Sequence, residues 1–352
     1  MARDGSRAGA RDPGPVVPGA RRKDQTTTEN SVARDERESR PLAGRVAVVT
    51  GASRGAGRGI ALELGAAGAV VYVTGRSIRG ASTPGYERML GHLGLDTMPG
   101  TIEETAEEAS RMGGTGIAVR CDHRRESDVR ALFARVEREH GRLDLLVNNA
   151  WGAHQDHIGA EPFWEQPLSH WEGMFENGVR NHILSSVVAA PLLVRQRHGL
   201  IVTVTFWDRW RHTGGFWYDL AKAAMARLAF GIARDLRPHG VASVALSPGW
   251  MRTELVLAAH ETTEARWREV PALARTESTR YIGRAVVALA SDPNVMARSG
   301  QVLRVGDLAT EYGFADVDGR WIPPFELPDG DAPARATGAT VEEAGREGAL
   351  RR

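Results

Sequence analysis

Short apolar runs alternate with stretches of helical periodicity from about residue 44 onward, and this alternation limits the possible folds more than any other feature. The runs read RVAVVT, AVVYVT, GIAVRCD, LDLLVNNA, LIVTVT, VASVALSPG and GQVLRV. Strands that are apolar along their whole length lie in parallel sheets that helices cover on both faces. We therefore predict an α/β chain with a doubly wound parallel sheet.

Local signals mark several helices between these runs. Thr101 precedes an acidic first turn, which is typical of a capped helix. The amphipathic stretch ESDVRALFARVEREHG ends at Gly141, a residue type that commonly terminates helices. We expect a long helix between about 169 and 197, and another that begins near Tyr218.

The two ends of the chain differ from the part between them. Residues 1–41 mix both charge signs with Pro, Gly and Thr, and they lack the apolar core of a secretory signal. Their acidic residues also argue against a transit peptide. Residues 329–352 have a similar character. We expect a disordered extension (or a start assigned too far upstream), one domain at 42–328, and a disordered tail.

Composition argues against several classes of function. The net charge of +1 gives no general attraction to nucleic acid or to an anionic membrane. No apolar run approaches the roughly 18 residues of a membrane-spanning helix. The single cysteine, Cys121, fits a reducing compartment, so we expect a cytoplasmic protein. His154 and His157 have no third ligand nearby in sequence, and we expect no metal.

The junction of the first strand and helix reads TGASRGAGRGI, in which Gly51, Gly55 and Gly57 have the spacing G-x-x-x-G-x-G. A turn of this kind bends tightly, lets a pyrophosphate approach the backbone, and directs a helix N-terminus at negative charge. Its position after a strand and before a helix makes the signal specific. The turn predicts a dinucleotide site on a Rossmann-type sheet.

Tyr218 and Lys222 stand four residues apart and so share one face of the predicted helix. Of 45 basic residues only Lys23 and Lys222 are Lys. An ammonium one turn away favours the phenolate and lowers the pKa of a tyrosine towards the range useful for acid–base catalysis. A compact ammonium suits that role better than a guanidinium. The pair therefore predicts a catalytic acid and the cation that tunes it.

These motifs together resemble the short-chain dehydrogenase/reductase family. The glycine turn, the NNA strand end at 148–150, the Tyr–Lys pair and the SPGWMRT loop after the sixth strand occur in the family order. The resemblance covers about 44–310. The later stretches ALASDPNVMARSGQVL and GDLATEYGFADVDGR resemble the branch that contains dehydrogenase/reductase member 1 and its bacterial relatives.

The resemblance implies roles for individual residues. Tyr218 would give a proton to a carbonyl, Asp122 would contact the adenine, and Thr253 would anchor the nicotinamide side. A homodimer or homotetramer through two long helices is also implied. The implied cofactor residues are Gly51, Ser53, Arg54, Gly55, Ala56, Gly57, Arg76, Asp122, Asn149, Ala150, Lys222, Pro248, Gly249 and Thr253.

The end of the second strand favours one nicotinamide cofactor. NAD-selective sites carry a carboxylate there for the ribose diol, whereas this chain has Thr74 and Arg76. Arg54 lies within the glycine turn, and two guanidiniums would pair with a 2′-phosphate. We predict a preference for NADP(H), with NAD(H) possible if both Arg side chains are solvated surface charges.

Two positions depart from the family pattern. The family places a catalytic Ser at the end of the fifth strand, where this chain has Thr205 and Phe206. Thr205 could supply the hydroxyl, and if Phe206 takes the place, Asp208 is the nearest polar substitute. The family Asn of the long helix is replaced by Gly178, with Asn177 and Asn181 beside it; neither neighbour faces the same way on a helix.

Tryptophans gather in the loops that follow the strands, where open α/β sheets bind ligands. These are Trp151, Trp207, Trp210, Trp217 and Trp250. If Trp151, Trp207, Trp210 and Trp250 line a pocket rather than pack, the pocket is broad and apolar and takes a bulky hydrophobic carbonyl or alcohol.

The sequence as a whole predicts an NADP(H)-dependent oxidoreductase that interconverts a carbonyl and an alcohol on a small-molecule substrate. Tyr218, Lys222 and Thr205 are the predicted catalytic residues. Because of the two departures, a redox-inactive NADP(H)-binding sensor or scaffold stays open as an alternative. An epimerase or dehydratase on the same fold is a second alternative.

Overall fold

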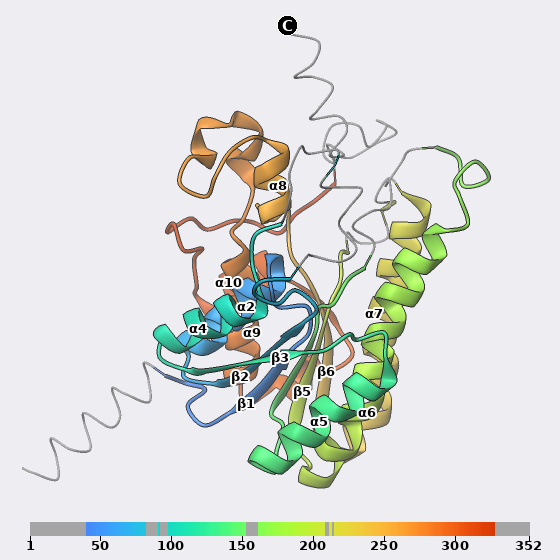
Figure 1. The fold of residues 1–352 in the computed structure, drawn as a ribbon, viewed down its shortest axis with the longest axis vertical. Coiled ribbons are helices and arrows are strands. Elements are labelled where there is room, and N and C mark those ends of the chain that lie inside the picture. Colours follow the sequence, from blue (N-terminus) through green and yellow to red (C-terminus); the bar gives the residue numbers. More distant parts are fainter. Residues whose placement is uncertain are drawn as a thin grey trace, which may run out of the picture. The chain divides into compact units, whose positions relative to one another are not determined.

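The computed structural model describes residues 40–81, 91, 98–152, 161–207, 211–212 and 215–327. Its centre is a seven-stranded sheet in the order β3-β2-β1-β4-β5-β6-β7, with every pair of neighbours parallel (Figure 1). The strands are β1 Val46–Val49, β2 Val70–Gly75, β3 Thr115–Arg120, β4 Leu145–Asn148, β5 Gly199–Val204, β6 Val241–Ser247 and β7 Val302–Arg304. The predicted fold class, a doubly wound parallel sheet, is confirmed.

Helices cover both faces of this sheet (Figure 1). One face carries α2 Gly55–Ala66, α4 Ile102–Arg111, α9 Thr279–Ser291 and α10 Val305–Tyr312. The other face carries α5 Glu126–His140, α6 Arg180–Gln196 and α7 Phe216–Leu236. A π-helical segment, η1 Glu172–Val179, leads into α6, and α8 Glu254–Ala259 follows β6. Short 3₁₀ turns lie at 237–239, 267–269, 271–275 and 295–298.

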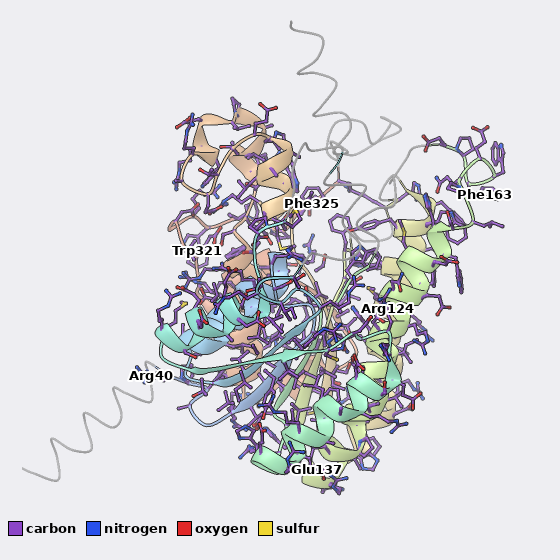
Figure 2. All side chains as sticks on the ribbon, viewed as in Figure 1. Arg40, Arg124, Glu137, Phe163, Trp321 and Phe325 are labelled. Carbon is purple, nitrogen blue, oxygen red and sulfur yellow. The ribbon has the colours of Figure 1, made fainter. Side chains whose placement is uncertain are left out.

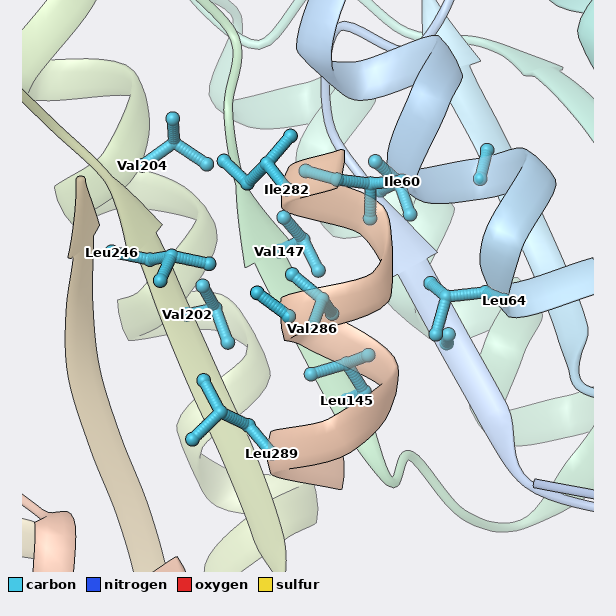
Figure 3. Packing of buried hydrophobic residues seen from close by; sticks show 14 of the residues in the cluster. Ile60, Leu64, Leu145, Val147, Val202, Val204, Leu246, Ile282, Val286 and Leu289 are labelled. Carbon is cyan, nitrogen blue, oxygen red and sulfur yellow. The ribbon is translucent and has the colours of Figure 1, made fainter. Parts of the chain in front are cut away.

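The strands are apolar along their length because successive side chains enter two different cores. Ala47 and Val49 of β1 pack towards α2 and α9, whereas Val46 and Val48 pack towards α5 and α6. Figure 3 shows part of the first core, in which Ile282 and Val286 of α9 lie over the sheet. Burying one such side chain contributes roughly 1.5–3 kcal/mol. Two-sided burial therefore fixes the register of the strands.

Local sequence signals fix several helix ends as expected. Thr101 caps α4, since its hydroxyl accepts from the N–H of Glu104 while the Glu104 carboxylate accepts from the N–H of Thr101. Gly141 ends α5 in the left-handed conformation with φ 65°. The helix expected at about 169–197 is present as η1 and α6, with a π-helical first part.

The strand order reverses between β1 and β4, and such a reversal opens a crevice at the carboxyl ends of the strands. The turns that follow β1, β4, β5 and β6 meet there. The predicted tails at 1–41 and 329–352 lie almost wholly outside the described residues, so their disorder stays a prediction. Within the described part of the chain, no helix combines the length and apolar character that crossing a membrane requires.

Candidate active site

The glycine turn after β1 is packed too closely for side chains. Gly51 has φ 65°, and a Cβ atom on it would lie 2.8 Å from the Cα of Ala150. A Cβ atom on Gly57 would collide with the Asn149 side chain and the Gly51 carbonyl. Glycine is therefore required at 51 and 57 by backbone conformation and by space.

Asn149 and Thr50 fasten this turn to the end of β4. The Asn149 amide donates to the carbonyls of Thr50 and Gly51 at 2.9 and 3.0 Å. The Thr50 hydroxyl accepts from the N–H groups of Asn149 and Ala150 at 2.8 and 2.9 Å. His182 of α6 lies 3.0 Å from the carbonyl of Ala150, and burial lowers its pKa to about 3. A neutral imidazole must donate here because a carbonyl only accepts.

His182 is not among the site residues predicted from the sequence. A histidine inside a predicted amphipathic helix carries no spacing signal that links it to a distant strand end. Its partner is a backbone carbonyl at a position 32 residues earlier in the chain. The contact depends on tertiary packing, which a single sequence does not show.

The first turn of α2 already holds an anionic group. The N–H of Gly55 donates a 2.7 Å hydrogen bond to the carboxylate of Glu254. Thr253 caps α8 and lies beside Gly55, while Ser53 is buried and Ala56 belongs to the same first turn of α2. Helix N-termini attract anions through free N–H groups and the helix dipole. The turn therefore fits the pyrophosphate of a dinucleotide.

The side chain of Arg54 reaches the end of β2. Its guanidinium donates to the Ser77 hydroxyl at 3.1 Å and to the Gly100 carbonyl at 2.7 Å. Thr74 is buried and its hydroxyl donates to the carbonyl of Val49 at 3.0 Å. The strand ends without a carboxylate, and the Arg54 guanidinium lies just beyond its end.

Asp122 follows β3 and is ionised. Its carboxylate accepts two hydrogen bonds from the Arg124 guanidinium, at 2.9 and 2.6 Å. Burial alone would raise the pKa of Asp122, but these bonds and the charges of Arg124 and Arg76 hold it at about 2. Arg76 therefore lies close enough to Asp122 to act on it, at the ends of β2 and β3.

Tyr218 and Lys222 both lie half-buried on α7, as their spacing predicts. The Lys222 Nζ atom lies 5.3 Å from the centroid of the Tyr218 ring and 3.8 Å from that of Trp151. The Trp151 and Tyr218 rings meet edge to face with centroids 6.0 Å apart. The structure thus brings together three residues that the sequence analysis singled out.

Burial has a larger effect than Lys222 on the pKa of Tyr218 in this structure. Burial raises the pKa of Tyr218 above its ordinary value, and burial lowers the pKa of Lys222 to about 7. The expectation that Lys222 lowers the pKa of Tyr218 is wrong here, because desolvation is the larger effect. The ammonium lies over the Trp151 indole.

The hydroxyl of Thr205 is directed at α7. It donates a 2.7 Å hydrogen bond to the backbone carbonyl of Lys222, and the side chain is buried. The Phe206 ring lies beside Tyr218, with ring centroids 6.3 Å apart. The geometry therefore gives Thr205 a structural contact and puts an aromatic ring next to the phenol, without supporting a substrate contact for Thr205.

Among the described residues, Trp151, Trp207 and Trp250 lie in separate surroundings and do not line one pocket. Trp207 packs against Ala226 and Ala229 of α7 and Ala245 of β6. Trp250 lies next to His260, with ring centroids 6.3 Å apart. Trp210 lies outside the described residues, as do Asp208, His154 and His157. Within the described ranges, no group of three or more His, Cys, Asp or Glu side chains is placed to hold a metal ion.

The loop after β6 rests on a buried carboxyl group. Pro248 is buried, and the N–H of Gly249 donates to the carboxyl of Glu277, whose pKa burial raises to about 8. A Cβ atom on Gly249 would lie 2.8 Å from Glu277 Oε2 and 3.3 Å from the Cβ of Phe325. Phe325, labelled in Figure 2, also packs against Phe206 with ring centroids 5.6 Å apart. The C-terminal segment 321–327 thus reaches the ends of β5 and β6.

Three features lie together at the carboxyl ends of the strands: the reversal of the strand order, the glycine turn and the Tyr218–Lys222 pair. They define a dinucleotide-dependent oxidoreductase of the doubly wound class. A family model described as "Enoyl-(Acyl carrier protein) reductase" matches residues 92–306. The chain belongs to the short-chain dehydrogenase/reductase family, as the resemblance predicted.

Similar proteins agree with this assignment. The chain is 43% identical to Dehydrogenase/reductase SDR family member 1 of Mus musculus, over 80% of this chain and 85% of that protein. A short-chain dehydrogenase from Mycobacterium thermoresistibile matches with TM-score 0.66 and 26% identity, over 84% and 99% of the two chains. A 7α-hydroxysteroid dehydrogenase complexed with NADH and 7-oxo glycochenodeoxycholic acid matches with TM-score 0.58 and 25% identity, over 75% and 93%.

Proposed function

We propose that this protein is an NADP(H)-dependent oxidoreductase that interconverts a carbonyl and an alcohol on a bulky hydrophobic substrate. The observation that carries the proposal is the position of Tyr218 and Lys222 on α7, beside the residues that follow β4 and β5. Because burial raises the pKa of Tyr218, its phenol keeps its proton and can give it to an oxygen that gains negative charge. Tyr218 is thus the proton donor in reduction.

The cofactor would be held by the turn after β1 and by the loop after β6. When bound, the nicotinamide supplies or accepts the hydride. Gly51 and Gly57 let the turn pack closely against Ala150 and Asn149, and the N–H of Gly55 is directed at an anion. Asn149 keeps the turn in this shape, and Thr253 lies beside it.

The preference for NADP(H) is supported by Arg54 and Arg76. Arg54 lies against Ser77 just beyond β2, and Arg76 acts electrostatically on Asp122 just beyond β3. Two guanidiniums near the ends of β2 and β3 suit a ribose 2′-phosphate, because Arg recognises phosphate by paired hydrogen bonds. NAD(H) stays possible, since one structural relative is described with NADH.

The preference for a bulky apolar substrate is supported by the surroundings of Tyr218. Its ring lies next to those of Trp151 and Phe206, and Phe325 packs against Phe206. Aromatic walls with one polar group are typical of sites for hydrophobic ligands. The steroid named with one structural relative is a ligand of this size class.

A homo-oligomer through α6 and α7 is part of the proposal. Ile183 and Val187 of α6 are 42% and 60% exposed, and Leu220 of α7 is 44% exposed. Apolar side chains exposed on two neighbouring helices are typical of an interface with another chain. The family resemblance implies a dimer or tetramer through the same helices.

The proposal is tested by measuring NADPH oxidation with a panel of carbonyl compounds, from short aliphatic aldehydes to polycyclic ketones. We expect turnover with the bulky apolar ketones, with kcat/KM at least tenfold above that for small polar carbonyls. NADH should bind more weakly than NADPH. Tight NADPH binding without oxidation by any compound in the panel would contradict the enzymatic proposal, and tighter NADH binding would contradict the cofactor preference.

A further inference from the structure

The end of β4 and the π-helical segment η1 interlock through two pairs of residues, each with one glycine. A Cβ atom on Gly178 would lie 2.7 and 2.9 Å from two atoms of the Trp151 indole. A Cβ atom on Gly152 would collide with Asn177. Each large side chain thus occupies the space that a side chain on the facing glycine would need. Trp151 fills the place of a side chain at position 178.

The indole in this position contacts Lys222. The Nζ atom lies 3.8 Å from the centroid of the Trp151 ring, which is well within the range of a cation–π contact. Tyr218 meets the same indole edge to face. Trp151 is therefore the one aromatic group among the described residues that contacts both members of the Tyr–Lys pair.

The position of the Trp151 indole is fixed by the hydrogen bonds of the preceding residue and by the packing of the ring. Ala150, directly before Trp151, donates its N–H to Thr50 and accepts from His182. The ring packs in a cluster built on Met174 and Val179 of η1 and Ala221 and Met225 of α7, all four of which are buried.

We propose that Trp151 is a positioning residue for Lys222: its indole, seated in the space left by Gly178, holds the Lys222 ammonium in its charged form beside Tyr218. The inference rests on the proposed function for its catalytic meaning. The physical statement, that the indole stabilises the Lys222 ammonium, can be tested without any catalytic assay.

Among the described residues, the other groups that contact Lys222 or act on it carry no negative charge. Tyr218 of α7 is protonated because burial raises its pKa, and His182 of α6 is neutral because burial lowers its pKa to about 3. Thr205, after β5, contacts the backbone carbonyl of Lys222. Burial lowers the pKa of Lys222 itself to about 7. The indole face is thus the contact that opposes this loss of charge.

The lysine content of the chain makes a direct measurement possible. Lys222 and Lys23 are its only two lysines, so a Lys23→Arg background labelled with ¹³Cε-lysine gives one lysine signal. The pKa of Lys222 is read from the pH dependence of that signal. In Trp151→Leu, which keeps bulk but removes the aromatic face, we expect the pKa to fall by roughly 0.5–1.5 pH units. In Trp151→Phe, a weaker aromatic face should give a smaller fall.

Trp321→Leu is the matched control, since Trp321 is 56% exposed and the substitution is chemically the same. Its Lys222 pKa should equal that of the parent. An unchanged Lys222 pKa in folded Trp151→Leu would overturn the proposal. If Trp151→Leu fails to fold, a Trp151→Phe pKa equal to or above that of the parent would overturn it.

NADPH oxidation in the same samples separates this inference from the proposed function. A parent protein that turns over no carbonyl, while Trp151→Leu still lowers the Lys222 pKa, would contradict the proposed function and leave the role of the indole standing. A parent protein that reduces carbonyls, while the Lys222 pKa is unchanged in Trp151→Leu, would support the proposed function and contradict the role of the indole.

Discussion

The carboxylate of Glu254 lies where it would weaken binding of the proposed cofactor. Its carboxylate accepts the N–H of Gly55, at the helix end that a pyrophosphate would use. Two negative charges about 4 Å apart repel by about 1 kcal/mol in water. A pyrophosphate bound at this turn would therefore compete with the Glu254 carboxylate for the N–H of Gly55.

From this we expect Glu254→Gln to bind NADPH about fivefold more tightly at low salt, because the amide keeps the shape and loses the charge. The gain should shrink as salt is added. Isothermal titration of NADPH measures both effects. Glu261→Gln, an exposed position on the same segment, is the control and should bind like the wild type. Equal or weaker NADPH binding by Glu254→Gln would contradict the competition.

The interlock of the β4 end with η1 makes a prediction about elements. Gly178→Ala should destabilise the fold by about 2–4 kcal/mol, because a Cβ atom there meets the indole of Trp151. In a Trp151→Ala background the same change should cost much less, since the space is then free. Chemical denaturation of the two single variants and the double variant measures this coupling.

Gly231→Ala provides the control for glycine replacement in a helix. Gly231 lies within α7, and a Cβ atom on it would meet nothing within 4 Å. That change should be neutral or stabilise by about 0.5–1 kcal/mol through helix propensity. Additive costs of Gly178→Ala and Trp151→Ala would show that the two positions do not share one space.

The elements were more predictable from the sequence than the contacts within the site. Thr101 and Gly141 act on their own helices, so their signals are local and both are confirmed. Each strand is buried on both faces, so it is visible in the sequence as a run of apolar residues. The orientation of the Trp207 side chain, by contrast, depends on its packing against α7 and β6. The orientation of the Thr205 hydroxyl depends on its hydrogen bond to the backbone carbonyl of Lys222. Such partners lie far apart in sequence and leave no pattern in it.

At the scale of the whole molecule, Glu277 should make stability depend on pH. It is buried beneath the loop after β6, and its Oε1 atom has no hydrogen-bond partner among the described residues. Burial raises its folded-state pKa to about 8, against a usual value of about 4.3 in an unfolded chain. The folded protein therefore binds more protons in this window, and stability falls as the pH rises through it.

Glu277→Gln removes this titration. The melting temperature of the variant minus that of the wild type should rise between about pH 5 and pH 8, with a slope equivalent to at most about 1.4 kcal/mol per pH unit. Calorimetry at several pH values measures the difference. A difference that stays constant across this range would contradict a raised pKa for Glu277.

We propose that Tyr218 delivers the proton when a carbonyl is reduced. Its most direct test is single-turnover hydride transfer from bound NADPH, followed at 340 nm, in wild type and Tyr218→Phe with a substrate found in the carbonyl panel. We predict that Tyr218→Phe binds NADPH within about threefold of wild type and transfers hydride at least 10²-fold more slowly, the scale of a lost general acid. Hydride transfer by Tyr218→Phe at a rate near that of the wild type would contradict the account.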